Sequence, residues 1–555
     1  MHSEIRKRPE GALLRTYLQA AGVAPESISK PMIGVVTAST QVFSERPQAK
    51  DLGDHVVSGV QSVGGIAVRW DTVRTPDLMS WGHSDGYSFA WRDQLADFIE
   101  SWSKQQALDG LVFVGDSQET LAGMVMAAAR LNLPAVLVTA GAPRWEFKMS
   151  GEPNGKKNVS MPDPFELLSD TLYAKKKSGS PADVQLDRLN ACLIAQENHS
   201  TYAFDLVLEA LGVTLPGVST SSAGSTHKKD LAVVSGKQVI ALIQAGAIFK
   251  RFLSINAFTN AIRLNAALGG SIDVVIHLMA LAHEVGLSLP LDLFEKISKE
   301  TPQLCRLGGV GEKEPHRIED LDRAGGVWAV MHALKSQILP TTTINGKGAA
   351  ELAKVSSIQD SQVIRMNKPY AKQSGLGVLR GNLAPKGAIF TINQIPPSVQ
   401  SIQGAAVIFE NEVDAAQAVS QGKIKKGTVM VIRGQGPRGG PGLKKLRILP
   451  ALIESRGLNK TLAVITDGRF PDSPSGIFIS TVAPESVVSG PLAVLKEGDV
   501  IEINIANRTL GVRLTEMDIR IRLSRWQAPD TKGRRGFLDR YSRLVSEANE
   551  GAVLK

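Results

Sequence analysis

Cysteine is nearly absent from this chain of 555 residues, which contains only Cys192 and Cys305. Two cysteines exclude a framework of several disulfides and any all-cysteine zinc or iron–sulfur site within one chain. Because structural disulfides are typical of oxidising compartments, this scarcity favours a cytoplasmic protein.

Long apolar runs are also absent. No stretch approaches the roughly 18–20 residues that a helix needs to span a bilayer. The N-terminal sequence, residues 1–8, is charged and has no apolar segment behind it, so it does not resemble a secretory signal. We therefore expect no membrane association.

Neither positive nor negative charge strongly dominates, because the net charge is only +9 over the whole chain. Basic residues cluster at 520–525 and 532–535, where they alternate with apolar residues as on a solvated helix face. No nucleic-acid recognition motif accompanies them, so we expect no nucleic-acid partner. The positive charge is equally suited to attracting a small anionic substrate.

A chain of this length predicts more than one domain. Strand-like and helix-like segments alternate in the first half, which predicts an α/β domain with a helix-covered parallel sheet over residues 1–370. The expected strands are 32–36, 66–70, 111–114 and 133–138, and the expected helices are 51–63, 87–102, 120–131, 271–285 and 318–334.

The second half has a different character, with short β-branched runs between turns. These predict a β-rich, barrel-like domain over residues 371–555. The expected strands are 429–433, 462–465, 477–482 and 500–505, with a hairpin turn at Asn507 and short helices at 412–421 and 444–458.

Five sequence strings in this order carry a family resemblance: residues 267–271, 319–327, 379–385, 439–442 and the loop Thr466-Asp467-Gly468-Arg469-Phe470. With them the chain resembles the dihydroxy-acid dehydratase / 6-phosphogluconate dehydratase family over nearly its whole length. The resemblance implies an α/β domain joined to a β-barrel-like domain, with a ligand site between them. It also implies homodimers or homotetramers and water elimination from a small hydroxy acid.

The same resemblance implies an iron–sulfur cluster held by three cysteines, a magnesium ion, and a serine base after the Thr-Asp-Gly-Arg-Phe run. In this chain Glu45, Ser117 and Ala195 stand where the three cysteines are expected, and Pro471 replaces the serine. Soft thiolates are the ligands that iron in a cluster prefers. We therefore expect no iron–sulfur cluster.

The magnesium positions have changed as well. Gln118 and Glu119 stand where the resemblance places an aspartate and a modified lysine, and Gln435 replaces a glutamate. Asp85 lies in an imperfect match to a further glutamate string. An uncharged amide is a weaker magnesium ligand than a carboxylate.

Polar residues at the altered positions predict a rebuilt pocket. The expected catalytic residues are Glu45, Glu119, His199, Asp472 and Ser473. The expected substrate-binding residues are Ser117, Gln118, Asp85, Gln435 and Arg469. A divalent metal is left open, with carboxylate and imidazole ligands at Glu45, Glu119, Glu197 and His199.

Structural interpretations of the same residues also stay open. Glu119 follows Asp116 at the spacing of a helix capping box. Glu45 fits a solvated loop charge, and His199 fits a surface position. Asp472 and Ser473, beside Pro471, fit a plain turn.

Two further patterns carry no functional prediction. Residues 434–439 match G-x-G-x-x-G, but Pro437 and Pro441 prevent a helix from following at once, so we do not expect dinucleotide binding. His277 and His283 fall within an apolar helical pattern and are expected to be packed helix residues rather than metal ligands.

The favoured hypothesis is a divergent, cluster-free enzyme, with lyase chemistry on a small hydroxy- or keto-carboxylate or a related polar compound. The alternative is a non-catalytic relative that binds a metabolite or pairs with an active paralogue. A third reading is an ordinary dehydratase with an unrecognised cluster, which two cysteines disfavour.

Overall fold

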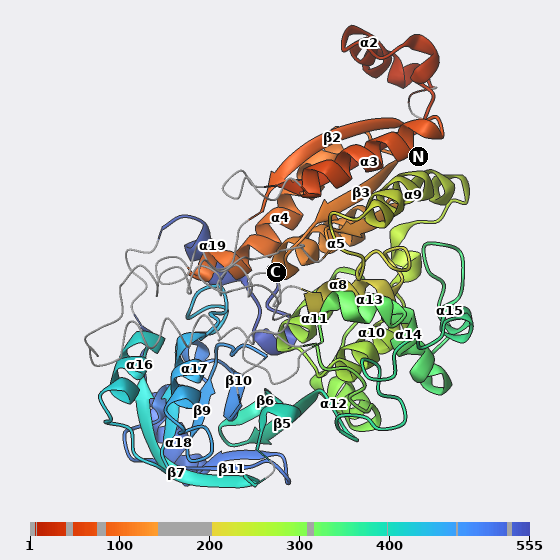
Figure 1. The fold of residues 1–555 in the computed structure, drawn as a ribbon. Coiled ribbons are helices and arrows are strands. Elements are labelled where there is room, and N and C mark those ends of the chain that lie inside the picture. Colours follow the sequence, from red (N-terminus) through yellow and green to blue (C-terminus); the bar gives the residue numbers. More distant parts are fainter. Residues whose placement is uncertain are drawn as a thin grey trace, which may run out of the picture.

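The structure, a computed structural model, describes Arg6 and residues 8–39, 48–74, 85–141, 202–307, 316–396, 398–472, 475–529 and 535–555. This part of the chain forms a four-stranded parallel sheet with surrounding helices and a closed β-barrel (Figure 1). The predicted combination of an α/β region and a C-terminal β-barrel-like region is confirmed.

The parallel sheet contains β1 (Met32–Ser39), β2 (Ile66–Val73), β3 (Gly110–Gly115) and β4 (Ala135–Thr139) in the order β2-β1-β3-β4. Strands β3 and β4 are buried along their whole length, as continuous apolar runs require when helices cover both faces. The edge strand β2 is half-buried over most of its length. The sheet helices are α3 (Gln48–Ser62), α4 (Asp85–Gln105), α5 (Gln118–Leu131) and α9 (Thr226–Gln244).

Further helices continue the N-terminal lobe beside the sheet (Figure 1). They are α8 (Tyr202–Leu211), α10 (Ile255–Ala267), α11 (Ile272–Glu284), α12 (Leu291–Glu300), α13 (Ile318–Arg323), α14 (Gly326–Ala333) and α15 (Ala349–Val355). Near the N-terminus, α2 (Ala12–Ala20) stands away from the body (Figure 1).

The prediction of one helix over residues 318–334 is wrong, because the chain breaks between α13 and α14. Gly325 has φ +110°, a left-handed conformation that interrupts the helix and that glycine adopts without a Cβ penalty. A Cβ at this position would also lie 2.6 Å from the carbonyl oxygen of Ser357. The helical periodicity was preserved across the break, so periodicity alone did not reveal it.

The barrel closes in the order β10-β6-β5-β12-β11-β7-β8-β9. Its strands are β5 (Leu376–Gly381), β6 (Ala384–Thr391), β7 (Ser401–Phe409), β8 (Val429–Ile432), β9 (Ala463–Thr466), β10 (Ile477–Ala483), β11 (Val500–Asn504) and β12 (Thr509–Val512). The hairpin predicted at Asn507 joins the antiparallel pair β11 and β12 and is confirmed.

Helices α16 (Glu412–Ser420) and α17 (Ile448–Ser455) share an apolar cluster with one side of the barrel, and α18 (Glu516–Ser524) and α19 (Phe537–Leu544) follow it. The helix expected over 444–458 is shorter than predicted, because Lys445 pairs with Arg469 in a β-bridge before α17 begins. The C-terminal segment returns to the N-terminal lobe, where Val553 joins the main core.

Candidate functional site

The sequence of the sheet connections creates a natural binding position between β1 and β3. The chain leaves β1 toward β2 on one side and leaves β3 toward β4 on the other. Because parallel crossovers are right-handed, α3 and α5 lie on opposite faces of the sheet. In open α/β sheets, ligands bind beyond the carboxyl ends of the strands at such a switch point. The segment Asp116–Glu119 follows β3 directly at this point.

Ser117 has an unusual backbone at the start of α5, with φ +67° and ψ 140°. Non-glycine residues rarely adopt positive φ, and such conformations cluster at functional sites. Its hydroxyl donates a hydrogen bond to Oγ1 of Thr120 at 2.8 Å, and the side chain is buried. Gln118 and Glu119 are also buried at this turn.

The capping-box interpretation of Asp116 and Glu119 is wrong. Ser117, not Asp116, is the N-cap of α5, and its side chain caps no backbone N–H. Asp116 instead pairs with Arg74, with 2.5 Å between Oδ1 and Nε. Glu119 faces a different partner, Arg469, whose Nη2 lies 3.6 Å from Glu119 Oε1.

Arg469 is the central residue of a buried polar cluster that joins the two lobes. Its guanidinium forms an ion pair with Asp273 at the start of α11 and donates from Nε to the carbonyl oxygen of Leu443 at 3.2 Å. The ring of Phe89, on α4, lies under the guanidinium at 4.8 Å from its centroid. Arg469 therefore contacts α4, α5 and α11 from the loop after β9.

Asp273 receives a second cation, Lys445, whose Nζ donates to Oδ2 at 2.7 Å. Burial by itself would raise the pKa of Asp273, but Arg469 and Lys445 hold the pKa of this carboxyl well below its usual range. These two cations therefore favour the ionised form of Asp273. Neither Asp273 nor Lys445 was predicted from the sequence as a site residue.

Asp472 lies next to this cluster, and its Oδ1 accepts a hydrogen bond from the backbone N–H of Ile272 at 3.2 Å. Burial raises the pKa of Asp472, and the neighbouring charge of Asp273 raises it further. A raised pKa is the direction of shift that acid–base catalysis by a carboxyl group requires. The structure therefore brings Asp472, Arg469 and Glu119 into one region, linked through Asp273.

Gln435 is engaged in holding the glycine-rich loop. Its Nε2 donates to the carbonyl oxygens of Glu410 at 2.7 Å and Arg433 at 3.0 Å. Its backbone N–H donates to Oδ1 of Asp467 at 2.8 Å. The side-chain N–H groups are thus committed to backbone acceptors.

For the other predicted site residues the side chains are not described. Asp85 is the first residue of α4. Glu45, Glu197, His199 and Ser473 lie outside the described residues. Three of the four predicted metal ligands are among them, so the metal prediction remains a prediction. Within the described ranges, no group of three or more His, Cys, Asp or Glu side chains is arranged to hold a metal ion.

The described residues do not fit an iron–sulfur cluster. Cys305 is fully buried in the main apolar core, and burial raises the pKa of its thiol to about 12. A cluster ligand must be a thiolate. Cys192 lies outside the described residues.

His277 and His283, both on α11, differ in burial. His277 is buried, stacks on Phe89 with 5.6 Å between ring centroids, and meets Phe204 edge-on at 5.2 Å. Burial, followed by the positive charge of Arg92, lowers the pKa of His277 well below its usual value. The prediction of a packed residue is confirmed for His277 but is wrong for His283, which is exposed at the end of α11.

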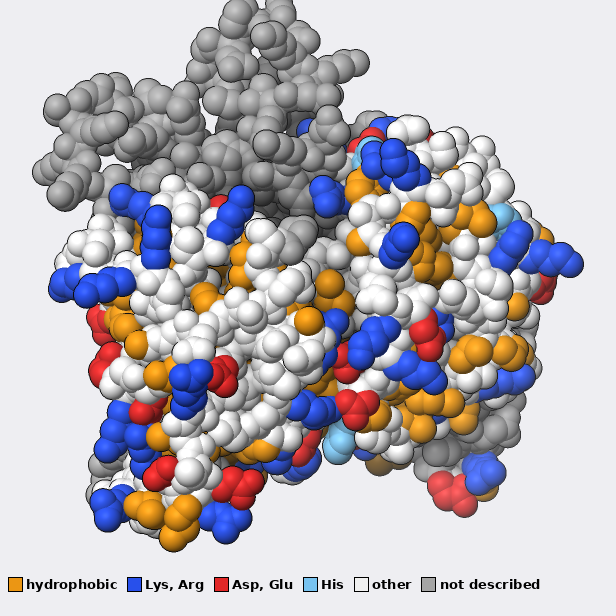
Figure 2. Space-filling view, turned by 90° about the horizontal axis from the view of Figure 1, so that it is seen from below, with side chains coloured by type: hydrophobic (Ala, Val, Ile, Leu, Met, Phe, Trp, Pro, Cys, Tyr) orange, Lys and Arg blue, Asp and Glu red, His pale blue; other side chains and the backbone are white. Residues whose placement is uncertain are grey.

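The outer surface is mixed in charge. On the face seen in Figure 2, Lys and Arg side chains are interspersed with Asp and Glu side chains. The basic helix face predicted near residue 520 belongs to α18, where Arg520 is exposed and Arg522 pairs with Asp499. No helix in the described ranges has the length and apolarity of a bilayer-spanning segment.

Comparison with known proteins covers nearly the whole chain. The family described as dihydroxy-acid/6-phosphogluconate dehydratase N-terminal matches residues 30–352, and its C-terminal counterpart matches residues 362–552. A dihydroxy-acid dehydratase of Endomicrobium trichonymphae is 34% identical over 553 residues, covering 100% of this chain and 99% of the relative. One of Geotalea daltonii is 36% identical over 557 residues, covering 99% and 98%.

Proposed function

Because the chain belongs to the dihydroxy-acid/6-phosphogluconate dehydratase family, we propose that it is a cluster-free lyase that acts on a small hydroxy- or keto-carboxylate or a related polar compound. The observation that carries the proposal is the buried group of Arg469, Asp273 and Glu119 beside the switch point of the sheet. This region holds a buried charged group, while residues other than cysteine stand where the resemblance places the cluster ligands.

The absence of a cluster is part of the proposal. Its support is the low cysteine content together with the buried thiol of Cys305. Ser117 stands at one of the three positions where the family resemblance places a cysteine, and its hydroxyl donates to Thr120. A hydroxyl is a poor substitute for a thiolate toward iron in a cluster.

In the proposed lyase, the protein has to remove a proton from the carbon next to the carboxylate and to assist departure of a hydroxyl group as water. Asp472 is the candidate base, because its raised pKa brings proton uptake closer to neutral pH. The loop that carries Asp472 is positioned by Arg469, whose partners lie on α5 and α11. A divalent metal held by Glu119 and by Glu45, Glu197 and His199 would supply Lewis-acid assistance.

The alternative is a non-catalytic relative that binds a metabolite or pairs with an active paralogue. Pro471, at the position of the expected serine base, has no ionisable group, and Gln435 is committed to backbone carbonyls. Both observations favour this alternative over a family enzyme of the ordinary kind.

We also propose a homodimer or homotetramer in the cytoplasm, with a small anionic or polar substrate and with no nucleic-acid or membrane partner. Helix α2 supports self-association: Leu13 and Tyr17, one turn apart, are 82% and 71% exposed on a helix that stands off the body. Sedimentation velocity on the purified chain tests the oligomeric state.

The test of function is a turnover screen of anaerobically purified protein. Sugar acids and branched dihydroxy acids are supplied with and without Mg²⁺ or Mn²⁺, and 2-keto acid products are trapped as hydrazones. Iron and acid-labile sulfide are assayed in the same preparation. We expect a keto acid product without stoichiometric iron and sulfide. Absence of turnover, with co-purification of an active family member at fixed stoichiometry, would support the alternative.

A further inference from the structure

A second buried charged cluster lies at the carboxyl ends of β3 and β4, outside the group around Arg469. Lys228 on α9 is fully buried, as are Asp205 and Glu209 on α8. Asp205 and Glu209 both act electrostatically on Lys228, and Asp116 acts on Asp205. Because Asp116 directly precedes Ser117, this cluster adjoins the candidate site.

Lys228 has fewer direct partners among the described residues than a buried ammonium group normally has. Its Nζ donates to the carbonyl oxygen of Val218. Within the described part of the chain, no carboxylate forms an ion pair with it, although Asp205, Glu209 and Asp322 all influence it. An ammonium carries three N–H donors, so the described residues account for only part of its capacity.

The two acidic side chains near Lys228, Glu209 and Asp205, differ in how many hydrogen-bond partners they have. Glu209 accepts hydrogen bonds from the backbone N–H groups of Gly217 at 3.0 Å and Ser219 at 3.2 Å. In contrast, among the described residues Oδ1 of Asp205 and Oγ of Ser221 are buried and have no hydrogen-bond partner. A buried polar group without a hydrogen-bond partner is costly, so such groups need an explanation.

The backbone at Gly141 packs closely against Lys228 and Ser221. Gly141, just beyond β4, has φ +79°. A Cβ on this residue would lie 3.2 Å from Nζ of Lys228 and 2.4 Å from the carbonyl oxygen of Ser221. Any larger side chain would occupy the position next to the ammonium group.

We propose that Lys228 and Asp205 form a subsite that binds a hydroxyl group of a small hydroxy-carboxylate. The inference rests on the proposed function and specifies which part of the substrate this region recognises. With Asp205 ionised, a group shared by the two side chains must accept from the ammonium N–H and donate to the free carboxyl oxygen. A hydroxyl does both, whereas a keto or carboxylate oxygen only accepts and an ammonium only donates.

The electrostatics agree with this geometry. Burial raises the pKa of Asp205 well above its ordinary value, and burial lowers the pKa of Lys228 to about 8. Both shifts reflect hydration that these groups have lost without full replacement. A bound hydroxyl would replace part of it. A trapped water molecule has the same donors and acceptors, so the experiment must distinguish the two.

The test compares matched acids that differ only in hydroxylation. Calorimetric titrations use glycerate against propionate, and 2,3-dihydroxyisovalerate against isovalerate. The proteins are the wild type, Lys228→Met, Asp205→Asn and the double variant, which removes both charges and so leaves neither unpaired. Lys229→Met is the control, because its side chain is partly exposed and pairs with Asp51 at 2.9 Å.

We expect the wild type and Lys229→Met to bind at least one hydroxylated acid tenfold or more tightly than the matched acid without hydroxyl groups. Lys228→Met, Asp205→Asn and the double variant should lose this preference. If the variants that fold keep the preference for the hydroxylated acid, water rather than substrate occupies the place between Lys228 and Asp205. The inference then fails, while the proposed function stands. If no hydroxylated acid binds to the wild type, both the inference and the proposed function fail.

Discussion

Arg469 and Asp273 form a buried ion pair between the loop after β9 and the first turn of α11. The two residues belong to different lobes, and each side chain is at most 3% exposed. Lys445 and Glu119 extend the pair into a charged group of four. This contact fixes the orientation of the loop that also carries Asp472.

Replacing Arg469 with methionine should therefore destabilise the protein strongly. Asp273 would keep only Lys445, and breaking a buried ion pair from one side costs about 3–5 kcal/mol. Urea unfolding measures the loss. Arg513→Met is the matched control, because its pair with Glu502 is exposed and should be worth about 0–1 kcal/mol. Equal losses in the two variants would contradict a structural role for Arg469.

Glu485 gives a prediction about pH. Burial raises the pKa of Glu485 to about 8, and the charge of Asp467 contributes to the shift. Since the folded pKa exceeds the ordinary value of 4.5, the group stabilises the fold fully below about pH 4.5, and this contribution is lost as the pH rises through 8.

Glu485→Gln should remove this dependence, because a side-chain amide is uncharged and does not titrate between these pH values. Between pH 5 and pH 9 the wild type should lose about 4 kcal/mol of unfolding free energy that the variant keeps. Unfolding free energies measured at both pH values test this. Glu502→Gln, at an exposed position, should follow the wild type, and parallel profiles for Glu485→Gln would refute the assignment.

Two substitutions of Ser117 distinguish the effect of its backbone conformation from the effect of its side chain. Its positive φ is accessible to glycine, so Ser117→Gly should be about 1 kcal/mol more stable than Ser117→Ala. The exposed helical residue Ser101 should show the reverse order, because glycine is less stable than alanine in a helix by about 1 kcal/mol. The same order at both positions would argue against strain.

The two Ser117 variants also test the site. Both lack the hydroxyl, so they should lose substrate binding to the same extent if that hydroxyl contacts the substrate. Titration with a hydroxy acid that the wild type binds would show this. Unchanged binding in both variants would remove Ser117 from the predicted substrate-binding residues.

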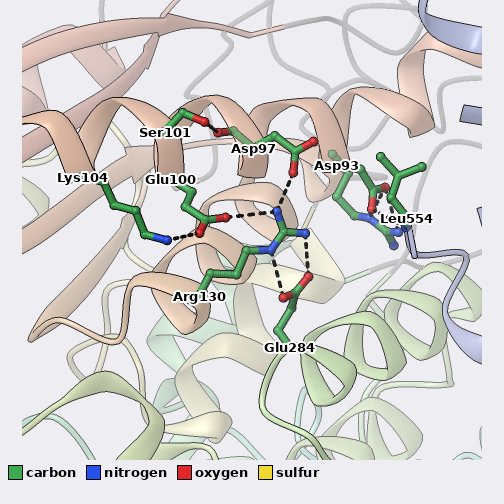
Figure 3. Close-up of polar contacts among 9 residues, drawn as sticks. Asp93, Asp97, Glu100, Ser101, Lys104, Arg130, Glu284 and Leu554 are labelled. Atoms are coloured by element: carbon green, nitrogen blue, oxygen red, sulfur yellow. Dashed lines mark hydrogen bonds and ion pairs between the residues drawn. The ribbon is translucent and has the colours of Figure 1, made fainter. Parts of the chain in front are cut away.

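Arg130 connects three helices of the N-terminal lobe (Figure 3). From α5 it donates to both oxygens of Glu284 on α11, at 2.9 and 2.7 Å, and to Asp97 on α4 at 2.6 Å. We expect Arg130→Met to lose about 2 kcal/mol of stability, because charge-assisted, two-pronged hydrogen bonds are stronger than ordinary ones.

The control for Arg130 is Lys104→Met on α4, whose side chain is 63% exposed and pairs with Glu100. An exposed pair of this kind should contribute less than about 0.5 kcal/mol. Thermal unfolding of both variants distinguishes them. A loss at Arg130 no larger than at Lys104 would show that the helices are held by apolar packing alone.

Much of the fold followed from local patterns in the sequence. Continuous apolar runs predicted the buried strands β1, β3 and β4 within one or two residues at their starts. Periodicity predicted α4, α5 and α11 with small boundary errors. The break at Gly325 was missed, because the left-handed backbone there depends on the close approach of Ser357, a contact outside the helix.

The candidate site was predicted only in part. Glu119, Arg469 and Asp472 were named from the resemblance, but their partners Asp273 and Lys445 were not. Lys228 was also missed, although it shares the buried helical spacing of Ala232, Ser235 and Val239 on α9. The same spacing places Lys228 on the buried face of α9. A lysine at such a position was the sequence signal that could have identified it.

The sequence by itself determined the family, the two-part architecture and the scarcity of thiolate ligands, because motifs, periodicity and composition are written along the chain. Only the tertiary structure decided which charges meet. The strength of an ion pair or the pKa of a carboxyl group depends on distance and burial between residues far apart in sequence. Arg469 and Asp273, or Lys228 and Asp205, acquire their chemistry only when the lobes and helices pack together.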